Sequence, residues 1–336
     1  MAPFIFEVFW SRFNPPKDTT PSFAGKTLII TGANTGVGYE AALKFARLGT
    51  QRLILAVRSL KKGEDAKSRI EATLDQVGKK RQGTIEIWQL DMLSYPSLQA
   101  FVARVEKEVP RLDYLVLNAG IVMATHQLSD YGWEKTLQVN ALSTALLGLL
   151  LMPKLRASKT QDCTPVLEII GSGSAYWPSK LLTSSSGGIL AAYNDPVNFD
   201  AASNYAVSKT FVEYIKASLV SLATNVQTGE PDVLIVSVCP GPTKSEVARD
   251  HTVWWIVFAI QMFRYLQRSG EEGARSYVSG LFLGKEGQGA FWQHDRVKEP
   301  MPLMQGEKGA KLQEQVWDEI VEALKQDVLD VKDLVK

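Results

Sequence analysis

From Lys26 onward the sequence alternates short apolar runs with longer helical patterns, and this alternation limits the folds open to the chain. Four runs between 27–32 and 113–120 are rich in β-branched and aliphatic residues, and segments with helical periodicity separate them. Parallel strands need a crossover between them, which a helix supplies. The pattern predicts the α/β class, with a doubly wound, mostly parallel sheet and helices on both faces.

The later part of the chain continues this pattern. Residues 131–155 predict a long helix, and the polar Asn140 within its apolar middle favours a core helix or subunit contact over a membrane span. No internal repeat or linker divides the chain. We expect one Rossmann-type domain at 23–292, with an insert at 176–203 and a substrate cover at 245–268, between an apolar N-terminal arm at 1–22 and a helical tail at 293–336.

Composition excludes several functions. Lys and Arg number 37 and Asp and Glu 36, so the chain has no general field that would attract nucleic acid. Its two cysteines and three histidines lack the spacing of metal ligands, and we expect no metal site. With disulfides and metals set aside, the cytoplasm is the expected location.

The N-terminal arm begins MAPFIFEVFW, which is apolar but interrupted by Glu7. It lacks the basic region of a signal peptide and the length of a spanning helix. The favoured interpretation is an arm that packs on its own body or on a second subunit. The alternative is peripheral association with a membrane surface through its aromatic residues.

The segment TGANTGVG at 31–38 lies directly between the first predicted strand and the first predicted helix. Glycines there permit a tight turn and let the backbone approach a pyrophosphate, while the start of the helix offers free N–H groups. Any tight turn uses glycine, but this position in the first strand–helix unit indicates a dinucleotide site, although the spacing departs from G-x-G-x-x-G. The expected cofactor-binding residues here are Gly32, Asn34, Thr35, Gly36, Val37 and Gly38.

Arg58 follows the second predicted strand, where chains of this type place the residue that faces the adenosine ribose. A forked cationic donor suits a 2′-phosphate, whereas an acidic residue would accept hydrogen bonds from a ribose diol. NADP(H) is therefore the expected cofactor, with Lys62 one helical turn later as a second contact. The alternative for both residues is a solvated surface charge.

Polar and small residues end the next two predicted strands. Asp91 is placed to accept a hydrogen bond from an adenine amine, and Asn118, Ala119 and Gly120 lie where open α/β sheets bind their ligands. Each of these residue types also forms turns, so none is decisive alone.

The stretch SNYAVSK sets Tyr205 and Lys209 four residues apart on a predicted helix, which by itself usually means two surface neighbours. Together with TGANTGVG, the Asn-Ala-Gly at 118–120, Asn140, Ser172 and a later Pro-Gly, however, the order of motifs resembles the short-chain dehydrogenase/reductase family over roughly 23–292. The motifs look most like the branch that holds retinol dehydrogenases and fungal reductases of lipophilic ketones.

The resemblance implies a catalytic set of Asn140, Ser172, Tyr205 and Lys209. Tyr205 would donate the proton in carbonyl reduction or accept it in alcohol oxidation, and the pKa of its hydroxyl, ordinarily about 10, would have to fall. Lys209 would lower that pKa by its positive charge and bind the nicotinamide ribose. Ser172 would hold the substrate oxygen, with Ser174 as the alternative, and Asn140 would hold a water near Lys209.

The resemblance also implies cofactor contacts from Pro240, Gly241, Thr243 and Ser245. Ser245 stands where the family motif has threonine, so its hydroxyl would keep the contact with the carboxamide. Ser172 and Tyr205 are 33 residues apart, farther than in compact members of the family. The insert at 176–203 is thus expected beside the substrate cleft, where it could form a lid.

The run HTVWWIVFAIQMF lies in the expected cover and suggests a bulky, lipophilic small molecule as substrate. We therefore expect an NADP(H)-dependent oxidoreductase that transfers hydride between the nicotinamide and a ketone, aldehyde or alcohol, with secondary metabolism as its setting. The alternatives are a membrane-associated retinoid or sterol dehydrogenase and a non-redox NADP-binding relative, either a pericyclic catalyst or a binding protein. A homodimer is compatible with the sequence, and membrane contact is not favoured.

Overall fold

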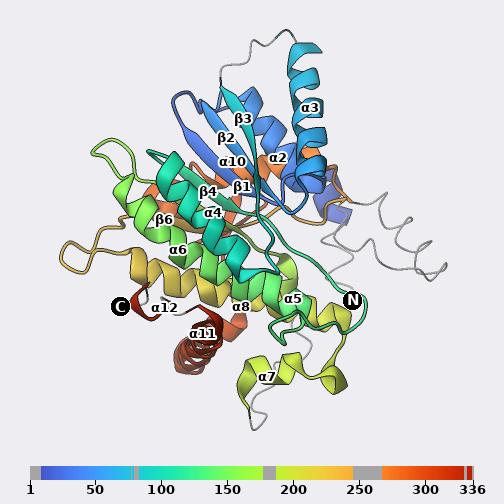
Figure 1. Ribbon diagram of the computed structural model, residues 1–336, viewed down its shortest axis with the longest axis vertical. Helices are drawn as coiled ribbons and strands as arrows, with labels where there is room; N and C mark the ends of the chain where they lie inside the picture. The colour runs from blue at the N-terminus through green and yellow to red at the C-terminus, as the bar shows by residue number, and fades with distance from the viewer. Residues whose placement is uncertain are drawn as a thin grey trace, which may run out of the picture.

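The computed structural model describes residues 9–76, 78, 83–176, 187–244, 267–328 and 331–334. Within them eight strands form one sheet in the order β3-β2-β1-β4-β5-β6-β7-β8 (Figure 1). All neighbouring strands are parallel except β7 and β8, so the predicted α/β class with a mostly parallel sheet is confirmed. The strands are β1 (Thr27–Thr31), β2 (Arg52–Val57), β3 (Thr84–Gln89), β4 (Tyr114–Leu117), β5 (Val166–Ile170), β6 (Leu234–Cys239), β7 (Phe291–Gln293) and β8 (Arg296–Lys298).

Helices cover both faces of this sheet (Figure 1). The face that carries Ile29 and Leu167 packs against α4, α6 and α8, and the face that carries Leu28 and Val236 packs against α2, α3 and α10. Successive residues of a strand point to opposite faces, so a strand covered on both sides is apolar throughout. The helices are α2 (Gly36–Arg47), α3 (Leu60–Gln76), α4 (Tyr95–Glu108), α5 (Lys135–Leu137), α6 (Ser143–Ala157), α7 (Gly188–Asn194), α8 (Ala201–Ala223), α10 (Gly270–Gly280), α11 (Gly306–Asp327) and α12 (Val331–Leu334).

The strand order reverses at β1, which lies between β2 and β4. The chain builds β1, β2 and β3 in one direction and then crosses back to place β4 on the other side of β1. In open α/β sheets, ligands bind at the carboxyl ends of the strands at such a reversal. The turns that follow β1 and β4 therefore mark the place where a site should be sought.

The long apolar helix differs from the sequence prediction at its start. It begins at Lys135 instead of 131, because the buried carboxylate of Glu134 accepts hydrogen bonds from the N–H groups of Thr136 and Leu137, both at 3.0 Å. A π-helical turn, Gln138–Leu142, then joins α5 to α6. The stretch from Lys135 to Ala157 is long and apolar enough to cross a membrane, but 89 % of its most apolar part is buried inside the protein, as in core helices.

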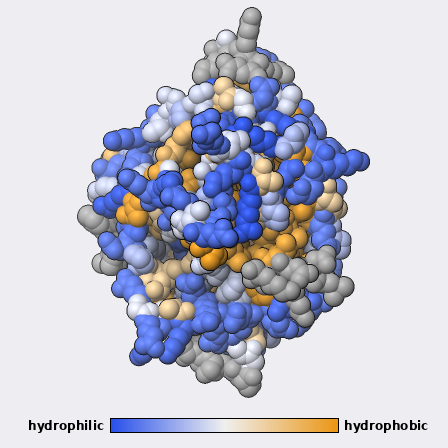
Figure 2. Space-filling model, turned by 90° about the vertical axis from the view of Figure 1, so that its left-hand side faces the viewer, coloured by the Kyte–Doolittle hydropathy of each residue, from blue (hydrophilic) through white to orange (hydrophobic). Residues whose placement is uncertain are grey.

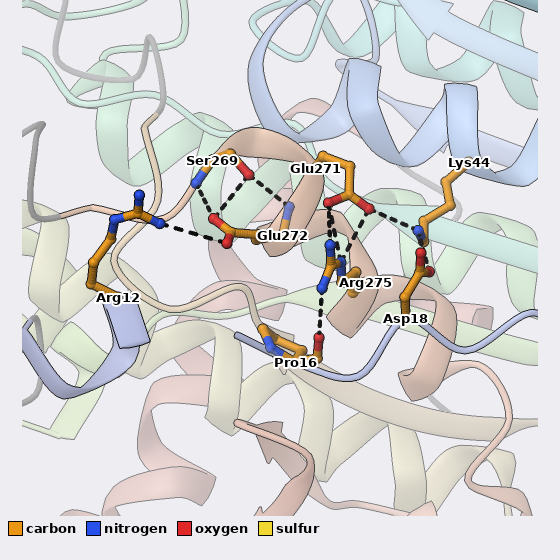
Figure 3. A network of polar contacts seen from close by, with 8 residues as sticks. All are labelled: Arg12, Pro16, Asp18, Lys44, Ser269, Glu271, Glu272 and Arg275. Atoms are coloured by element: carbon orange, nitrogen blue, oxygen red, sulfur yellow. Dashed lines mark hydrogen bonds and ion pairs between the residues drawn. The ribbon is translucent and has the colours of Figure 1, made fainter. Parts of the chain in front are cut away.

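The described part of the N-terminal arm packs on its own chain, against α10 and α2 (Figure 3). Arg12 pairs with Glu272 at 3.6 Å, and the guanidinium of Arg275 donates to the carbonyl of Pro16 at 3.2 Å. Lys44 of α2 contacts both Asp18 of the arm and Glu271 of α10. These polar contacts hold the described part of the arm on its own body. That is one of the two arrangements that the sequence favours, the other being contact with a second subunit.

Hydrophilic residues cover most of the face shown in Figure 2, and hydrophobic ones gather toward its middle. Large apolar side chains that are exposed are mostly scattered singly along the chain, which is usual for a folded surface. Phe9 and Phe13 on the arm are the exception, since they are 53 % and 68 % exposed and their ring centroids lie 5.0 Å apart. Membrane contact through this arm stays a prediction that the sequence does not favour.

Helix α11, near the C-terminus, packs against α8 and α7. It belongs to the core on the face of the sheet that α4, α6 and α8 cover. Val316, Ile320 and Leu324 are fully buried there, and they follow one side of the helix at spacings of four. The carboxylate of Glu319 also accepts a hydrogen bond from the N–H of Leu190 at 2.8 Å, which ties α11 to the second half of the insert. Residues 177–186 of that insert lie outside the described residues.

Ile320→Ala tests whether α11 is an integral part of the domain. Loss of a fully buried isoleucine side chain should lower the free energy of unfolding by about 2–5 kcal/mol, measured by urea denaturation. Asp318→Ala, on the exposed side of the same helix, serves as the control and should change it by less than about 0.5 kcal/mol. Equal, small effects of both substitutions would show that α11 adds little to the stability of the domain.

Candidate active site

The glycine turn that follows β1 is held against the end of β4. Gly32 and Gly36 adopt positive φ angles of 67° and 61°, which residues with a side chain rarely adopt. A Cβ on Gly38 would lie only 2.4 Å from Nδ2 of Asn118. These glycines therefore let the first turn of α2 approach the strand ends closely, as a phosphate-binding turn requires.

Helix α2 starts without a side chain to satisfy its first N–H groups. Thr35 occupies the N-cap position but its hydroxyl makes no capping hydrogen bond, whereas Ser94, Asp200 and Ser269 cap α4, α8 and α10 in this way. The first turn of α2 also carries no acidic residue. Free N–H groups at a helix start bind anions, so the turn formed by Asn34 and Thr35 and by the start of α2 fits the pyrophosphate of a dinucleotide.

Asn118, expected to contact the cofactor, instead uses its side chain to hold the glycine turn. Its Nδ2 donates to the carbonyls of Thr31 at 2.8 Å and Gly32 at 3.2 Å, and its Oδ1 accepts from the hydroxyl of Tyr277 at 2.8 Å. The side-chain amide is thus occupied by protein partners, and Ala119 and Gly120 are left to line the edge. No local pattern predicts the role of Tyr277, which lies 159 residues away on α10.

Arg58 and Lys62 are exposed at the carboxyl end of β2 and the start of α3. Within the described residues neither side chain forms an ion pair, so both cations are available to an anionic ligand. Asp91, after β3, accepts a hydrogen bond from the N–H of Leu93 at 3.0 Å through one carboxylate oxygen. The arrangement agrees with the expected contacts to the adenosine half of a cofactor but does not distinguish them from surface charges.

Tyr205 and Lys209 lie one turn apart on α8, facing the carboxyl end of β5. Lys209 is 6 % exposed, and its ammonium donates to the carbonyl of Ile170 at 2.8 Å and lies 6.0 Å from the ring centroid of Tyr205. Asp200 fixes the start of this helix by accepting a hydrogen bond from the N–H of Ser203 at 2.8 Å. The fold therefore brings the two residues to the sheet edge that also holds the glycine turn.

Burial dominates the ionisation of this pair. It raises the pKa of Tyr205 to about 12, an effect that a hydrogen bond with Ser172 opposes. Burial also lowers the pKa of Lys209 to about 8, while the nearby Cys239 and Glu213 oppose that change. The sequence predicted a lowered tyrosine pKa, but in the protein alone the loss of hydration outweighs the attraction of the ammonium, which is directed at the Ile170 carbonyl.

The two candidate serines have different partners in the structure. Ser172 follows β5 and hydrogen-bonds Tyr205. Ser174, in the 3₁₀ turn Gly173–Tyr176, directs its hydroxyl at Ser172 Oγ, 2.9 Å away, and its N–H donates to the same atom. Ser172 is therefore favoured as the residue that faces a substrate oxygen, and Ser174 as the residue that orients it.

Asn140 lies in the π-helical turn and is 1 % exposed. Its Oδ1 accepts from the N–H of Ile121 at 2.8 Å, and its Nδ2 donates to the Ile121 carbonyl at 2.9 Å and to Oγ of Ser208 at 3.0 Å. Protein groups thus satisfy the amide that was expected to hold a water. A Cβ on Gly120 would lie 3.2 Å from Asn140 Oδ1 and 3.6 Å from Lys209 Nζ, so the loop after β4 lies close to both side chains.

The loop after β6 carries Pro240, Gly241 and Thr243. Thr243 directs its hydroxyl at the carbonyls of Pro240 and Gly241, at 3.2 and 3.0 Å, and Gly241 has a φ of 76°. The buried guanidinium of Arg268 donates to the carbonyl of Pro240 at 3.3 Å and to that of Ser11 at 2.7 Å. This loop is thus tied to the N-terminal arm, a link that the sequence did not reveal because its partners are far apart in the chain.

Ser245 and the apolar run of the expected cover lie outside the described residues.

Comparison with known proteins agrees with this geometry. Residues 26–163 match the family model described as short chain dehydrogenase. The short-chain dehydrogenase/reductase ffsI of Aspergillus flavipes is 37 % identical over 328 residues, which cover 97 % of this chain and 94 % of the relative. The short-chain dehydrogenase/reductase phmF of Phaeosphaeria nodorum is 38 % identical over 96 % of this chain and 93 % of the relative.

Solved structures share the fold at lower identity. A short-chain dehydrogenase from Sphingobium yanoikuyae in complex with NADPH has a TM-score of 0.54 and 22 % identity, and the match covers 76 % of this chain and 84 % of that one. The short chain dehydrogenase from Shigella flexneri has a TM-score of 0.56 and 19 % identity over 86 % and 98 % of the two chains.

The chain belongs to the short-chain dehydrogenase/reductase family. It is therefore an oxidoreductase that works with a nicotinamide cofactor on a small molecule. The predicted family is confirmed, and the likeness to the retinol dehydrogenase branch stays a prediction.

Alanine substitutions separate the two serines. Ser172→Ala should lower kcat for carbonyl reduction about 10²–10³-fold, because it removes a hydrogen bond to the oxygen on which charge develops. Ser174→Ala should lower it less, since that hydroxyl acts through Ser172. Steady-state kinetics with a carbonyl substrate measures both, and full activity in Ser172→Ala would reverse the assignment.

Proposed function

We propose that the protein is an NADPH-dependent reductase of a bulky, lipophilic ketone or aldehyde. The observation that carries the proposal is the meeting of Tyr205, Lys209 and Ser172 at the carboxyl edge of the sheet, beside the loop of Gly120. In a sheet of this kind that edge is where ligands bind. Tyr205 and Lys209 come from α8, Ser172 from the segment after β5 and Gly120 from the loop after β4, so a surface pair on one helix would not explain their arrangement.

Each side chain has a distinct task in this reaction. A bound NADPH would supply hydride from C4 of the nicotinamide to the carbonyl carbon. Tyr205 donates its hydroxyl proton to the carbonyl oxygen, which completes the alcohol, and the hydroxyl of Ser172 stabilises the charge on that oxygen. The ammonium of Lys209 stabilises the phenolate left on Tyr205 and is held in place by the Ile170 carbonyl.

The protonation state of Tyr205 is the one that carbonyl reduction needs. With a pKa raised to about 12, its hydroxyl stays protonated at neutral pH and is ready to donate. Alcohol oxidation needs the phenolate, which is scarce until the pH rises. We therefore expect the oxidation rate to increase with pH, while reduction needs only the protonated tyrosine and a charged Lys209.

Two exposed cations support NADPH over NADH. Arg58 stands directly after β2, next to the glycine turn of β1, and Lys62 lies one turn further along α3. Neither pairs with a carboxylate within the described residues, as a site for a 2′-phosphate would need. The proposal of a lipophilic substrate is based on the sequence of the expected cover, HTVWWIVFAIQMF. Secondary metabolism remains the expected setting.

Tyr205→Phe tests the proposed reaction. It should lower reduction of an accepted carbonyl about 10²–10⁴-fold because the proton donor is lost, while the Kd for NADPH, measured by nicotinamide fluorescence, stays unchanged. Tyr176→Phe is the matched control, since its hydroxyl donates to the Glu299 carbonyl at 2.7 Å and has no task in the proposed reaction. Retained reduction in Tyr205→Phe would refute the assigned proton donor.

Arg58→Asp tests the cofactor. It should weaken NADPH binding about 10–100-fold, because a charged hydrogen bond contributes about 1.5–3 kcal/mol, and should leave NADH binding unchanged or improved. Lys107→Asp makes the same charge change at the exposed end of α4 and should leave both affinities as they are. Equal use of NADH and NADPH by the unaltered protein would overturn this part of the proposal.

A further inference from the structure

Helix α8 carries a row of buried charges beyond the catalytic pair. Lys209, Glu213 and Lys216 follow one another at about one turn each, and they are 6 %, 2 % and 5 % exposed. Buried charges are rare because dehydration is costly, and they persist where partners compensate them. Glu213 and Lys216 therefore need an explanation that the reaction described above does not give.

Part of the explanation is a buried ion pair within α8, which hydrogen bonds connect to β6 and to the residue before β7. Lys216 Nζ lies 2.8 Å from Glu213 Oε2, and Ser237 of β6 donates its hydroxyl to the same oxygen at 2.9 Å. Lys216 also donates to the carbonyl of Ala290 at 3.4 Å. These contacts satisfy one oxygen of the carboxylate and hold Lys216 in place.

The other oxygen of Glu213 points toward the active site. Oε1 is buried and accepts no hydrogen bond from the described residues. It lies 3.0 Å from the position that a Cβ on Gly171 would take, and the carbonyl of the preceding residue, Ile170, accepts the hydrogen bond from Lys209. Glu213 and Lys209 thus meet the same peptide at the end of β5, directly before Ser172. The ion pair with Lys216 alone does not require Glu213 Oε1 to face the peptide that binds Lys209.

We propose that Glu213 and Lys216 are positioning residues that set the charge on Lys209: the carboxylate of Glu213 keeps Lys209 protonated, and Lys216 limits that effect. The proposal rests on the proposed function of Lys209. Both residues act through the ammonium of Lys209, from which Glu213 is one turn away and Lys216 about two turns away along α8. A like-charged neighbour and an opposite one on the same buried helix face make the charge on Lys209 adjustable in both directions.

Among the described residues, few other ionisable groups lie near Lys209. On α8 it is faced by Tyr205, and from the end of β6 by Cys239, whose influence on Lys209 has the same sign as that of Glu213. Burial raises the pKa of Tyr176, in the turn after β5, and the carboxylate of Glu213 adds to that effect. Glu168 of β5 is fully buried on the opposite face of the sheet, against Gly280 of α10.

The sign of the effect follows from these positions. Burial lowers the pKa of Lys209 to about 8, so the ammonium is present below that pH and is lost as the pH rises through it. Removing the negative charge of Glu213 should make Lys209 lose its proton at lower pH. Removing the positive charge of Lys216 should have the opposite result.

Two substitutions test the proposal in the full-length protein. Glu213→Gln should move the alkaline limb of the kcat/KM profile for carbonyl reduction down by about one pH unit, and Lys216→Met should move it up by a similar amount. The same displacements should appear in the pH dependence of the Kd for NADPH, measured by nicotinamide fluorescence without substrate. This second readout works even if no carbonyl is reduced, so failure of the proposed function can be told apart from failure of the inference.

Controls separate charge from folding. Each single substitution leaves a buried charge without its partner and should lower the urea midpoint, so the double variant Glu213→Gln/Lys216→Met provides a fold with neither charge. Its alkaline limb should return toward that of the unaltered protein. The inference is overturned if the two single variants move the limb in the same direction, or if folded variants leave it in place.

Discussion

The junction of β1 and β4 is the constraint on which the site depends. Asn118, at the end of β4, donates to the backbone of the turn after β1, and the hydroxyl of Thr31 accepts hydrogen bonds from the N–H groups of Asn118 and Ala119. Tyr277 of α10 closes the network from the second face of the sheet. Because the glycine turn is held this closely, the uncapped start of α2 is fixed beside the loop that approaches Lys209.

The chemistry of the site depends on what burial does to ionisable groups. Tyr205 stays protonated and Lys209 loses part of its affinity for a proton because neither charged form is well hydrated. The protein opposes this loss with partners from several elements: the Ile170 carbonyl, Cys239 and Glu213. At neutral pH Tyr205 is protonated and Lys209 still carries its charge, because its pKa is lowered only to about 8. This combination suits the proposed carbonyl reduction.

Much of the fold followed from the local pattern. The apolar runs that became β1 to β6 and the helices between them were predicted within a few residues, because a strand buried on both faces must be apolar and a helix must alternate its faces. The π-helical turn around Asn140, the short helix α7 inside the insert and the antiparallel strand β8 were missed. Helix α7 is held by a tertiary contact, that of Glu319 with Leu190, whereas β8 pairs with β7 across the two-residue turn of His294 and Asp295.

The sequence by itself determined the α/β class, the turn of glycines and the order of Asn140, Ser172, Tyr205 and Lys209, because these depend on backbone freedom and on residue spacing along single elements. Only the tertiary structure decided what those residues do to one another. In the folded protein the amide of Asn118 donates to the backbone at the glycine turn, and Ile121 and Ser208 provide the hydrogen-bond partners of Asn140. Burial raises the pKa of Tyr205, which the sequence predicted to fall. Burial and the direction of hydrogen bonds arise from segments far apart in the chain, and spacing along one helix cannot reveal them.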